Sequence, residues 1–389
     1  MNKTSILVLF CILFVFHQSF SQVNPTSPIE KFDDTPLTKE IALKITENLS
    51  GDSLKLLAIY DWITQNISYD SVLYEKIKNS MYVRNSTASR DLSKLKPLHT
   101  CSEILNKKRT ICLGYAYLFS AMCNAVGIKN AVVKGYGRTD SLAAPTPNHA
   151  WVAFRLSDKW YLADPTWDSG IQQGMKDKSP DKYDYIFLMQ EPETFLETHY
   201  PLDPLWQLQT SILSIADWQK FNKTTNSSSI VFSYVDSLKQ YEKNSAEKNF
   251  ISSLNRIIKV KEYVFVGHFE YCGYFFLPMY EEISYYSNLN RRLNTGNKNI
   301  EEMAGKILPR KKELFERLAK IEFYIKRYNY HVTKLTQVHN PFDSFPIKDI
   351  PAEIAEIKRV NNYLVQERNS LTATIKELEP YQKKSTAKK

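Results

Sequence analysis

Glycine, cysteine and long apolar runs are all scarce in this sequence. Glycine accounts for only 11 of the 389 residues, which favours a helix-rich architecture. Five cysteines are too few for a scaffold built from disulfides. Hydrophobic residues make up 43% of the chain, which excludes a disordered protein. The length exceeds that of one average domain and leaves room for two.

The one long apolar run lies at the start of the chain. Lys3 precedes an apolar stretch from Ile6 to Phe16, and Ser19 and Ser21 stand where small residues precede a cleavage site. The stretch is too short for a hydrocarbon core, which needs about 20 residues. Residues 1–21 are therefore predicted to be a cleaved signal peptide, and the mature protein to be secreted or periplasmic. No later stretch is long and uncharged enough to span a membrane, so we expect no integral membrane span.

Positive charge is concentrated near the C-terminus. The net charge is +9, and residues 301–389 hold 18 Lys and Arg against 12 Asp and Glu. We interpret the last residues, KKSTAKK, as a solvated and frayed tail. Charges of both signs are mixed elsewhere, and no basic motif is interleaved with stacking aromatic residues. We therefore expect no nucleic-acid partner.

Four cysteines remain beyond the predicted signal peptide: Cys101, Cys112, Cys123 and Cys272. Cys112 and Cys123 would lie about 16 Å apart on one continuous helix, which is beyond disulfide reach. If Cys112 is a free thiol, at most one intrachain disulfide can form among the other three.

Residues 22–210 have the pattern of an α+β domain. Residues 38–67 carry a helical stripe of apolar positions. The segment Ile111–Ile128 is apolar nearly all round, as expected of a buried helix. A strand (NAVVKGYG), a proline-containing loop and a hairpin follow it. This order predicts a buried helix packed on an antiparallel sheet.

Residues 211–389 are predicted to form a separate, mostly helical region. A polar stretch at 221–229 is a candidate linker. An apolar seam with spacings of four and three follows, made of Leu314, Leu318, Ile321, Ile325, Tyr328, Val332 and Leu335. A proline-bearing break separates it from a second seam at 354–378, which predicts an antiparallel helical hairpin. We interpret these seams as the core of a bundle, and a surface for a protein partner or for self-association is the alternative.

The hairpin NHAWVAFRLSDKWYLADPTW (148–167) holds a histidine and an aspartate on its two arms. The turn near Ser157 permits two registers. One pairs His149 directly with Asp164, and the other puts Asp164 beside Trp151 and diagonal to His149. A carboxylate that binds one imidazole nitrogen fixes the tautomer and leaves the other nitrogen to take a proton. The pair is therefore predicted to be two parts of a nucleophilic triad.

Cys112 is the candidate nucleophile because it begins the buried helix. The positive end of the helix dipole favours a thiolate there, and a neighbouring imidazolium would favour it further. The unpaired N–H groups of the first turn could also bind an oxyanion, and Gly114 leaves little bulk beside the sulfur. Cys123, deep in the same helix, is interpreted as core packing, and His199 as structural.

Three motifs resemble the transglutaminase-like superfamily of papain-like Cys-His-Asp enzymes. They are TICLGYAYLFSAMCNAVGI around Cys112, NHAWVAF around His149 and WYLADPTW around Asp164. Upstream, LLAIYDWITQNISYD resembles the helix that precedes the catalytic helix. Downstream, FLMQEPETFLETHYPLDPLWQLQ resembles the segment that closes the domain in the subgroup related to the kyphoscoliosis peptidase. The resemblance covers residues 38–210.

The resemblance implies a role for each triad residue. Cys112 would be the nucleophile, His149 the general base and acid, and Asp164 the orienting carboxylate. Ile111 and Leu113 flank the cysteine where many bacterial members have a small and an acidic residue, a departure that concerns substrate contacts more than the triad.

Two tryptophans and one cluster complete the candidate site residues. Trp151 and Trp167 are candidate substrate-binding residues. A metal site built from His99, Cys101 and Cys112 is disfavoured because HTC is a poor ligand spacing. No metal and no cofactor are therefore expected.

The leading hypothesis is an exported thiol enzyme that forms a thioester with a peptide or amide carbonyl. Hydrolysis is favoured over Gln-Lys crosslinking, and the expected substrate is a protein or peptide of the envelope or extracellular space. The alternative is a catalytically inactive scaffold or binding module that acts through its helical C-terminal region.

Overall fold

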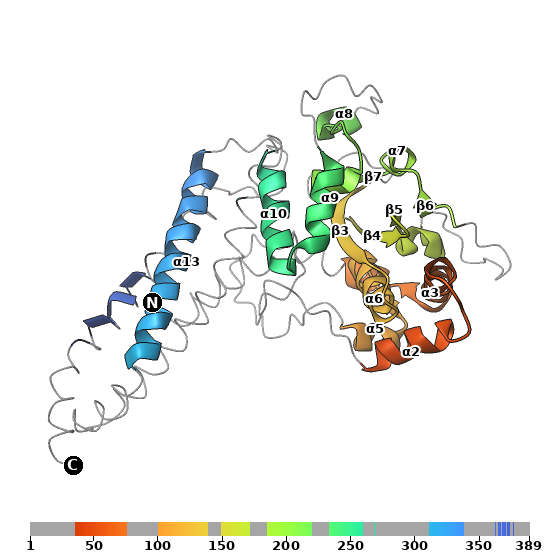
Figure 1. Ribbon diagram of the computed structural model, residues 1–389, viewed down its shortest axis with the longest axis horizontal. Coiled ribbons are helices and arrows are strands. Elements are labelled where there is room, and N and C mark those ends of the chain that lie inside the picture. The colour runs from red at the N-terminus through yellow and green to blue at the C-terminus, as the bar shows by residue number, and fades with distance from the viewer. Residues whose placement is uncertain are drawn as a thin grey trace, which may run out of the picture. The chain divides into compact units, whose positions relative to one another are not determined.

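The computed structural model describes residues 36–75, 100–138, 149–171, 185–219, 233–259, 268 and 311–337, with a few single residues between 362 and 376 (Figure 1). By their contacts, these residues fall into two compact units, one with the described residues up to 259 and the other with those from 268 onward. The predicted signal peptide and most of the second C-terminal seam lie outside the described residues.

A five-stranded antiparallel sheet forms the centre of the first unit, in the order β6-β5-β4-β3-β7. Its strands are β3 (Asn130–Gly137), β4 (His149–Leu156), β5 (Lys159–Ala163), β6 (Leu188–Gln190) and β7 (His199–Pro201). A separate parallel pair joins β1 (Ser68–Tyr69) to β2 (Arg109–Thr110). Because β3 pairs with both β4 and β7, the start of β4 and the start of β7 meet near one end of the sheet.

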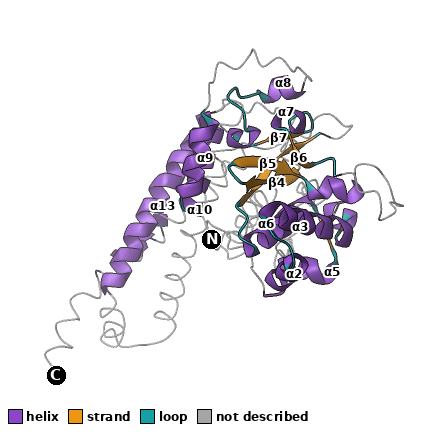
Figure 2. Ribbon diagram, turned by 45° about the vertical axis from the view of Figure 1, so that its right-hand side comes forward, coloured by secondary structure: helices purple, strands orange, loops and turns teal. Residues whose placement is uncertain are grey.

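Four helices cover one face of the sheet (Figure 2). They are α2 (Pro36–Thr46), α3 (Asp52–Asn66), α5 (Cys101–Lys107) and α6 (Cys112–Ala125). Every residue of α6 from Cys112 to Cys123 is buried, which confirms the prediction of a helix buried on all sides. Val152 and Phe154 of β4 join the same apolar core as α6, so the helix packs directly on the sheet. The predicted α+β fold is confirmed.

The other face of the sheet packs on a second apolar cluster. Trp151 of β4, Trp160 of β5 and Trp206 belong to it, together with Leu238. The elements on this side are α7 (Pro192–Phe195), η4 (Pro204–Gln207) and α9 (Tyr234–Lys243), while α8 (Ile215–Gln219), α10 (Ala246–Lys259) and η3 (Trp167–Ile171) complete the unit. Alternate residues of each central strand therefore enter two different cores, as the two-residue period of a strand requires.

Helices α9 and α10 pack on this unit through buried and charged contacts. Glu242 of α9 accepts from Lys129 at 3.0 Å and lies 3.2 Å from a guanidinium nitrogen of Arg155. Arg256 of α10 binds both carboxylate oxygens of Asp203, at 2.8 and 2.7 Å. The compact unit thus extends beyond residue 210, where the sequence predicts a helical C-terminal region to begin.

The second unit contains the long helix α13 (Lys311–Gln337). Ile325, Tyr328 and Val332 are buried along it, in agreement with the predicted seam. His331 also lies on α13, and its Nδ1 is 2.9 Å from Nδ1 of His268.

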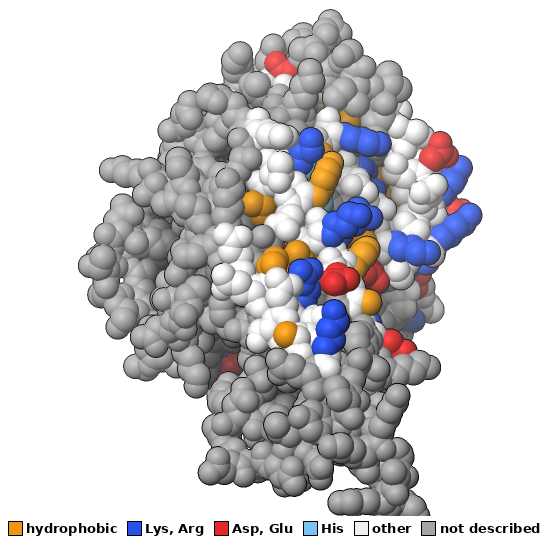
Figure 3. All heavy atoms as spheres, turned by 90° about the vertical axis from the view of Figure 1, so that its left-hand side faces the viewer, with side chains coloured by type: hydrophobic (Ala, Val, Ile, Leu, Met, Phe, Trp, Pro, Cys, Tyr) orange, Lys and Arg blue, Asp and Glu red, His pale blue; other side chains and the backbone are white. Residues whose placement is uncertain are grey.

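One face of the molecule shows Lys and Arg side chains mixed with hydrophobic and acidic ones (Figure 3). None of the described helices is both long and apolar enough to cross a membrane.

Gly135 permits the close approach of three strands near the site. It pairs with His149 on one side and Pro201 on the other. A Cβ atom at this position would lie 2.1 Å from the Tyr200 carbonyl oxygen and 2.5 Å from the Trp151 ring. Because one of these atoms belongs to the backbone, a side chain here would push the strands apart.

Tyr60 of α3 ties the helical layer to the turn that follows β5. Its hydroxyl lies 2.6 Å from Asp168 Oδ2 and 2.9 Å from the Asp164 carbonyl oxygen. Asp168 also accepts from the backbone N–H groups of Ile186 and Phe187. Burial raises the pKa of Asp168 to about 7, although the hydrogen bonds from Tyr60 and Phe187 oppose this rise.

We predict that Gly135→Ala destabilises the protein by about 3 kcal/mol, since overpacking against backbone cannot be relieved by a rotamer change. Chemical denaturation would measure the free energy of unfolding. Ala131→Gly on the same strand is the control, with an expected cost of about 1 kcal/mol. Equal losses for the two variants would contradict the steric explanation.

Tyr60→Phe is predicted to destabilise the protein by about 2 kcal/mol, and by more at pH 8.5 than at pH 5.5. Because the pKa of Asp168 is raised in the folded protein, its protonated form stabilises the fold. This stabilisation is lost as the pH rises through about 7. Removing a donor to the ionised carboxylate therefore costs most above that pH. Thermal unfolding at the two pH values tests this, with Tyr161→Phe as control. A loss that does not change with pH would rule out the link to Asp168.

Candidate active site

Cys112 is the first residue of α6, as the sequence predicted. Ile111 caps the helix in an extended conformation, and no side chain hydrogen-bonds the first turn as a cap. Cys112 is a free cysteine, and 8% of its surface is exposed. A Cβ on Gly114 would lie 2.0 Å from Thr110 Oγ1, so only glycine fits beside the start of this helix. The positive end of the α6 dipole therefore lies at Cys112.

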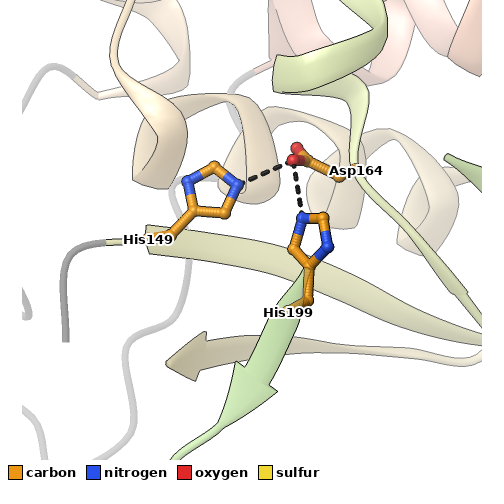
Figure 4. A group of neighbouring side chains, drawn as sticks. All are labelled: His149, Asp164 and His199. Atoms are coloured by element: carbon orange, nitrogen blue, oxygen red, sulfur yellow. Dashed lines mark hydrogen bonds and ion pairs between the residues drawn. The ribbon is translucent and has the colours of Figure 1, made fainter. Parts of the chain in front are cut away.

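His149 and Asp164 meet at one end of the β4–β5 hairpin. Val152 pairs with Ala163, so the hairpin has the second of the two predicted registers, which makes Asp164 diagonal to His149. Ser157 adopts a positive φ of 53° in the turn. His149 Nε2 lies 2.7 Å from Asp164 Oδ2 (Figure 4). The predicted hairpin contact between the two side chains is present.

Charge holds the three predicted triad residues together. Burial alone would lower the pKa of His149, but the Asp164 carboxylate, and a hydrogen bond with Cys112, raise it to about 10. Burial would likewise raise the pKa of Asp164, but His149 and His199 hold it well below its usual range. The arrangement thus favours an imidazolium between a carboxylate and the thiol.

Asp164 has two further partners. Its Oδ1 accepts from the backbone N–H of Thr166 at 2.8 Å. Its Oδ2 also lies 3.1 Å from Nε2 of His199, the first residue of β7. The sequence alone indicates a structural role for His199 and no link to the site. A histidine in THYPLDP carries no local signal of this contact, because the pairing of β7 with β3 creates it.

Aromatic side chains enclose the two histidines. Trp167 stacks on His149 with ring centroids 5.0 Å apart. Phe195 stacks on His199 at 4.1 Å. Trp151 is fully buried and Trp167 is 7% exposed, so the structure shows a packing role for both. The substrate-binding role predicted for these two tryptophans stays a prediction.

The ligand atoms of His149, Asp164 and His199 all lie within 4.8 Å of one another, close enough to hold a metal ion. In the structure the same atoms form two hydrogen bonds to Asp164 Oδ2. Cys123 is also a free thiol, and its full burial raises its pKa, which agrees with the predicted role in core packing. Cys272 lies outside the described residues.

Comparison with known proteins supports the motif assignments. Residues 39–165 match the family model of the Transglutaminase-like superfamily. The kyphoscoliosis peptidases of Mus musculus and Homo sapiens are each 29% identical to this chain over 174 residues, which cover 43% of the chain and 24% of each relative. The chain therefore spans about a quarter of the length of these curated relatives. A crystal structure of a TGase is 19% identical and covers 43% of this chain and 40% of that chain, with a TM-score of 0.26.

The matched family region includes all three predicted triad residues, since it runs from α2 to the residue after Asp164. Together with the contact between His149 and Asp164, this match supports a cysteine-based enzyme in general terms. Residues 39–165 are therefore similar to the Transglutaminase-like superfamily and to the kyphoscoliosis peptidases, as the sequence motifs predicted.

Proposed function

We propose that this protein is an exported thiol enzyme that acts on peptide or amide bonds of proteins. The observation that carries the proposal is the contact between His149 and Asp164, together with the position of Cys112 at the start of the buried helix α6. His149 uses Nε2 to bind Asp164 at 2.7 Å, and Cys112 contributes to the raised pKa of His149. An imidazole held in this way can take a proton from a thiol and later return it to a leaving group.

In the proposed reaction, the Cys112 sulfur attacks the carbonyl carbon of an amide. His149 holds the thiol proton and gives it to the leaving amine as the carbon–nitrogen bond breaks, which leaves a thioester on Cys112. The backbone N–H groups of the first turn of α6 lack intrahelical partners and would bind the oxyanion. Asp164 keeps the His149 ring oriented throughout.

The acyl group then passes to water or to an amine, and we propose water. Hydrolysis needs no second protein substrate in the site, and the mouse and human relatives are named as peptidases. We propose export because residues 1–21 have a positive n-region and a short apolar run. An exported enzyme would meet proteins of the envelope or extracellular space. The helical C-terminal region is proposed to bind a partner or a second copy.

We predict that Cys112→Ala lowers turnover at least about a thousandfold and leaves the thermal unfolding midpoint nearly unchanged. Purified protein would be incubated with a peptide mixture, and mass spectrometry would report cleaved, deamidated or amine-linked products. Cys123→Ala is the matched control. Cys123 is the second cysteine of α6 and is fully buried, so this variant should retain activity. Full activity in the Cys112 variant would exclude it as the nucleophile.

The same spectra separate hydrolysis from crosslinking. Cleaved or deamidated peptides are the expected products, because water is the proposed acceptor. If an added primary amine is mostly linked to glutamine, the proposed hydrolysis is contradicted, but the proposed thioester intermediate is not. If Cys112 reacts with iodoacetamide no faster than Cys123 at neutral pH, the thiol enzyme is excluded and the binding module replaces it.

A further inference from the structure

A second histidine shares the carboxylate of the proposed triad. His199 Nε2 lies 3.1 Å from Asp164 Oδ2, the same oxygen that His149 contacts (Figure 4). We propose that His199 is a positioning residue that holds Asp164 against His149 and so strengthens the stabilisation of the imidazolium beside Cys112. This inference rests on the thiol chemistry proposed above.

The hydrogen bonds around His199 define its tautomer. An ionised Asp164 can only accept, so His199 Nε2 must carry a proton and donate it. On the other side of the ring, Nδ1 lies 2.8 Å from Thr198 Oγ1, whose hydroxyl can donate to it. A neutral ring protonated at Nε2 satisfies both contacts. Thr198 therefore sets the orientation of His199, and His199 sets that of Asp164.

Burial keeps His199 neutral. The side chain is fully buried, and this lowers its pKa to about 4 in spite of the hydrogen bond to Asp164. Among the described residues, the titratable groups that act on it are Asp164 at the end of β5 and His149 on β4. Its ring also has a hydrogen bond with the Phe195 backbone and contacts four aromatic side chains: Trp151, Trp167, Phe187 and Phe195. One charged and one neutral imidazole thus face a single carboxylate, so the charges of His149 and Asp164 balance each other.

Loss of the His199 donor would weaken the charge pair. Asp164 would keep only His149 and the Thr166 N–H, and a buried carboxylate with fewer donors is less stable in its ionised form. The carboxylate would also be freer to turn away from His149. The imidazolium would then be less stabilised beside Cys112, and the thiol would react more slowly with an alkylating reagent.

Two substitutions test this, through the rate at which iodoacetamide alkylates Cys112 across pH in the full chain. His199→Phe keeps an aromatic ring but has no donor, whereas His199→Gln keeps an N–H and loses the ring. We expect His199→Phe to move the acid limb of the profile up by about one pH unit, which means about tenfold slower alkylation below the midpoint. His199→Gln should stay within about threefold of the unsubstituted protein.

Phe195→Leu is the matched control for packing, because this ring stacks on His199 but donates nothing to Asp164. It should lower the thermal unfolding midpoint without moving the pH profile. The reverse order, with His199→Gln slowed and His199→Phe unchanged, would show that His199 only packs, and would overturn the inference. If His199→Phe does not fold, Thr198→Val is measured instead. Thr198→Val should move the acid limb of the alkylation profile to higher pH, by less than His199→Phe. An unchanged profile would count against the proposal.

The unsubstituted protein tests the proposed function in the same experiment. A Cys112 that reacts no faster than Cys123 would contradict the thiol enzyme itself. A fast-reacting Cys112 whose profile ignores the His199 and Thr198 substitutions would overturn only the positioning role.

Discussion

The buried carboxylate of Asp164 is the group on which the rest of the site depends. Its side chain is fully buried, and an unpaired ionised carboxylate in that position would be strongly destabilising. Three donors stabilise it: His149, His199 and the Thr166 N–H. The ionised carboxylate in turn stabilises the protonated form of His149 and raises its pKa. Cys112 contributes to the same rise.

The fold brings these donors together from distant parts of the chain. His149 begins β4, His199 begins β7, and both strands pair with β3, so their first residues meet at one end of the sheet. Gly135 allows the close backbone approach at this end, and Gly114 leaves room for the Thr110 side chain at the start of α6. Tyr60 of α3 holds the turn after β5 through the Asp164 carbonyl and Asp168. Residues of the sheet therefore hold the Asp164 carboxylate, and the helical layer holds its backbone.

Local sequence patterns were sufficient to predict the helix, the hairpin and the contact between His149 and Asp164. The apolar character of residues 111–128 predicted a buried helix, and the alternation around the Ser157 turn predicted the pair of strands. The register needed the structure, because both turn positions suit the sequence. His199 and Asp168 were missed for a different reason: their contacts come from long-range pairing, which leaves no periodic signal in the chain. The docking of α9 was missed likewise, because Glu242 binds Lys129 across more than a hundred residues.

The central claim is that Asp164 keeps His149 protonated beside Cys112. Nuclear magnetic resonance with ¹⁵N-labelled histidine tests it directly, since the chain has seven histidines and a His149→Gln variant identifies the relevant signal. We expect the His149 nitrogens to keep the imidazolium signature at about pH 8 and to lose it in Asp164→Asn. A His149 that is already neutral at that pH in the unsubstituted protein, and titrates near 6.5, would contradict the charge pair.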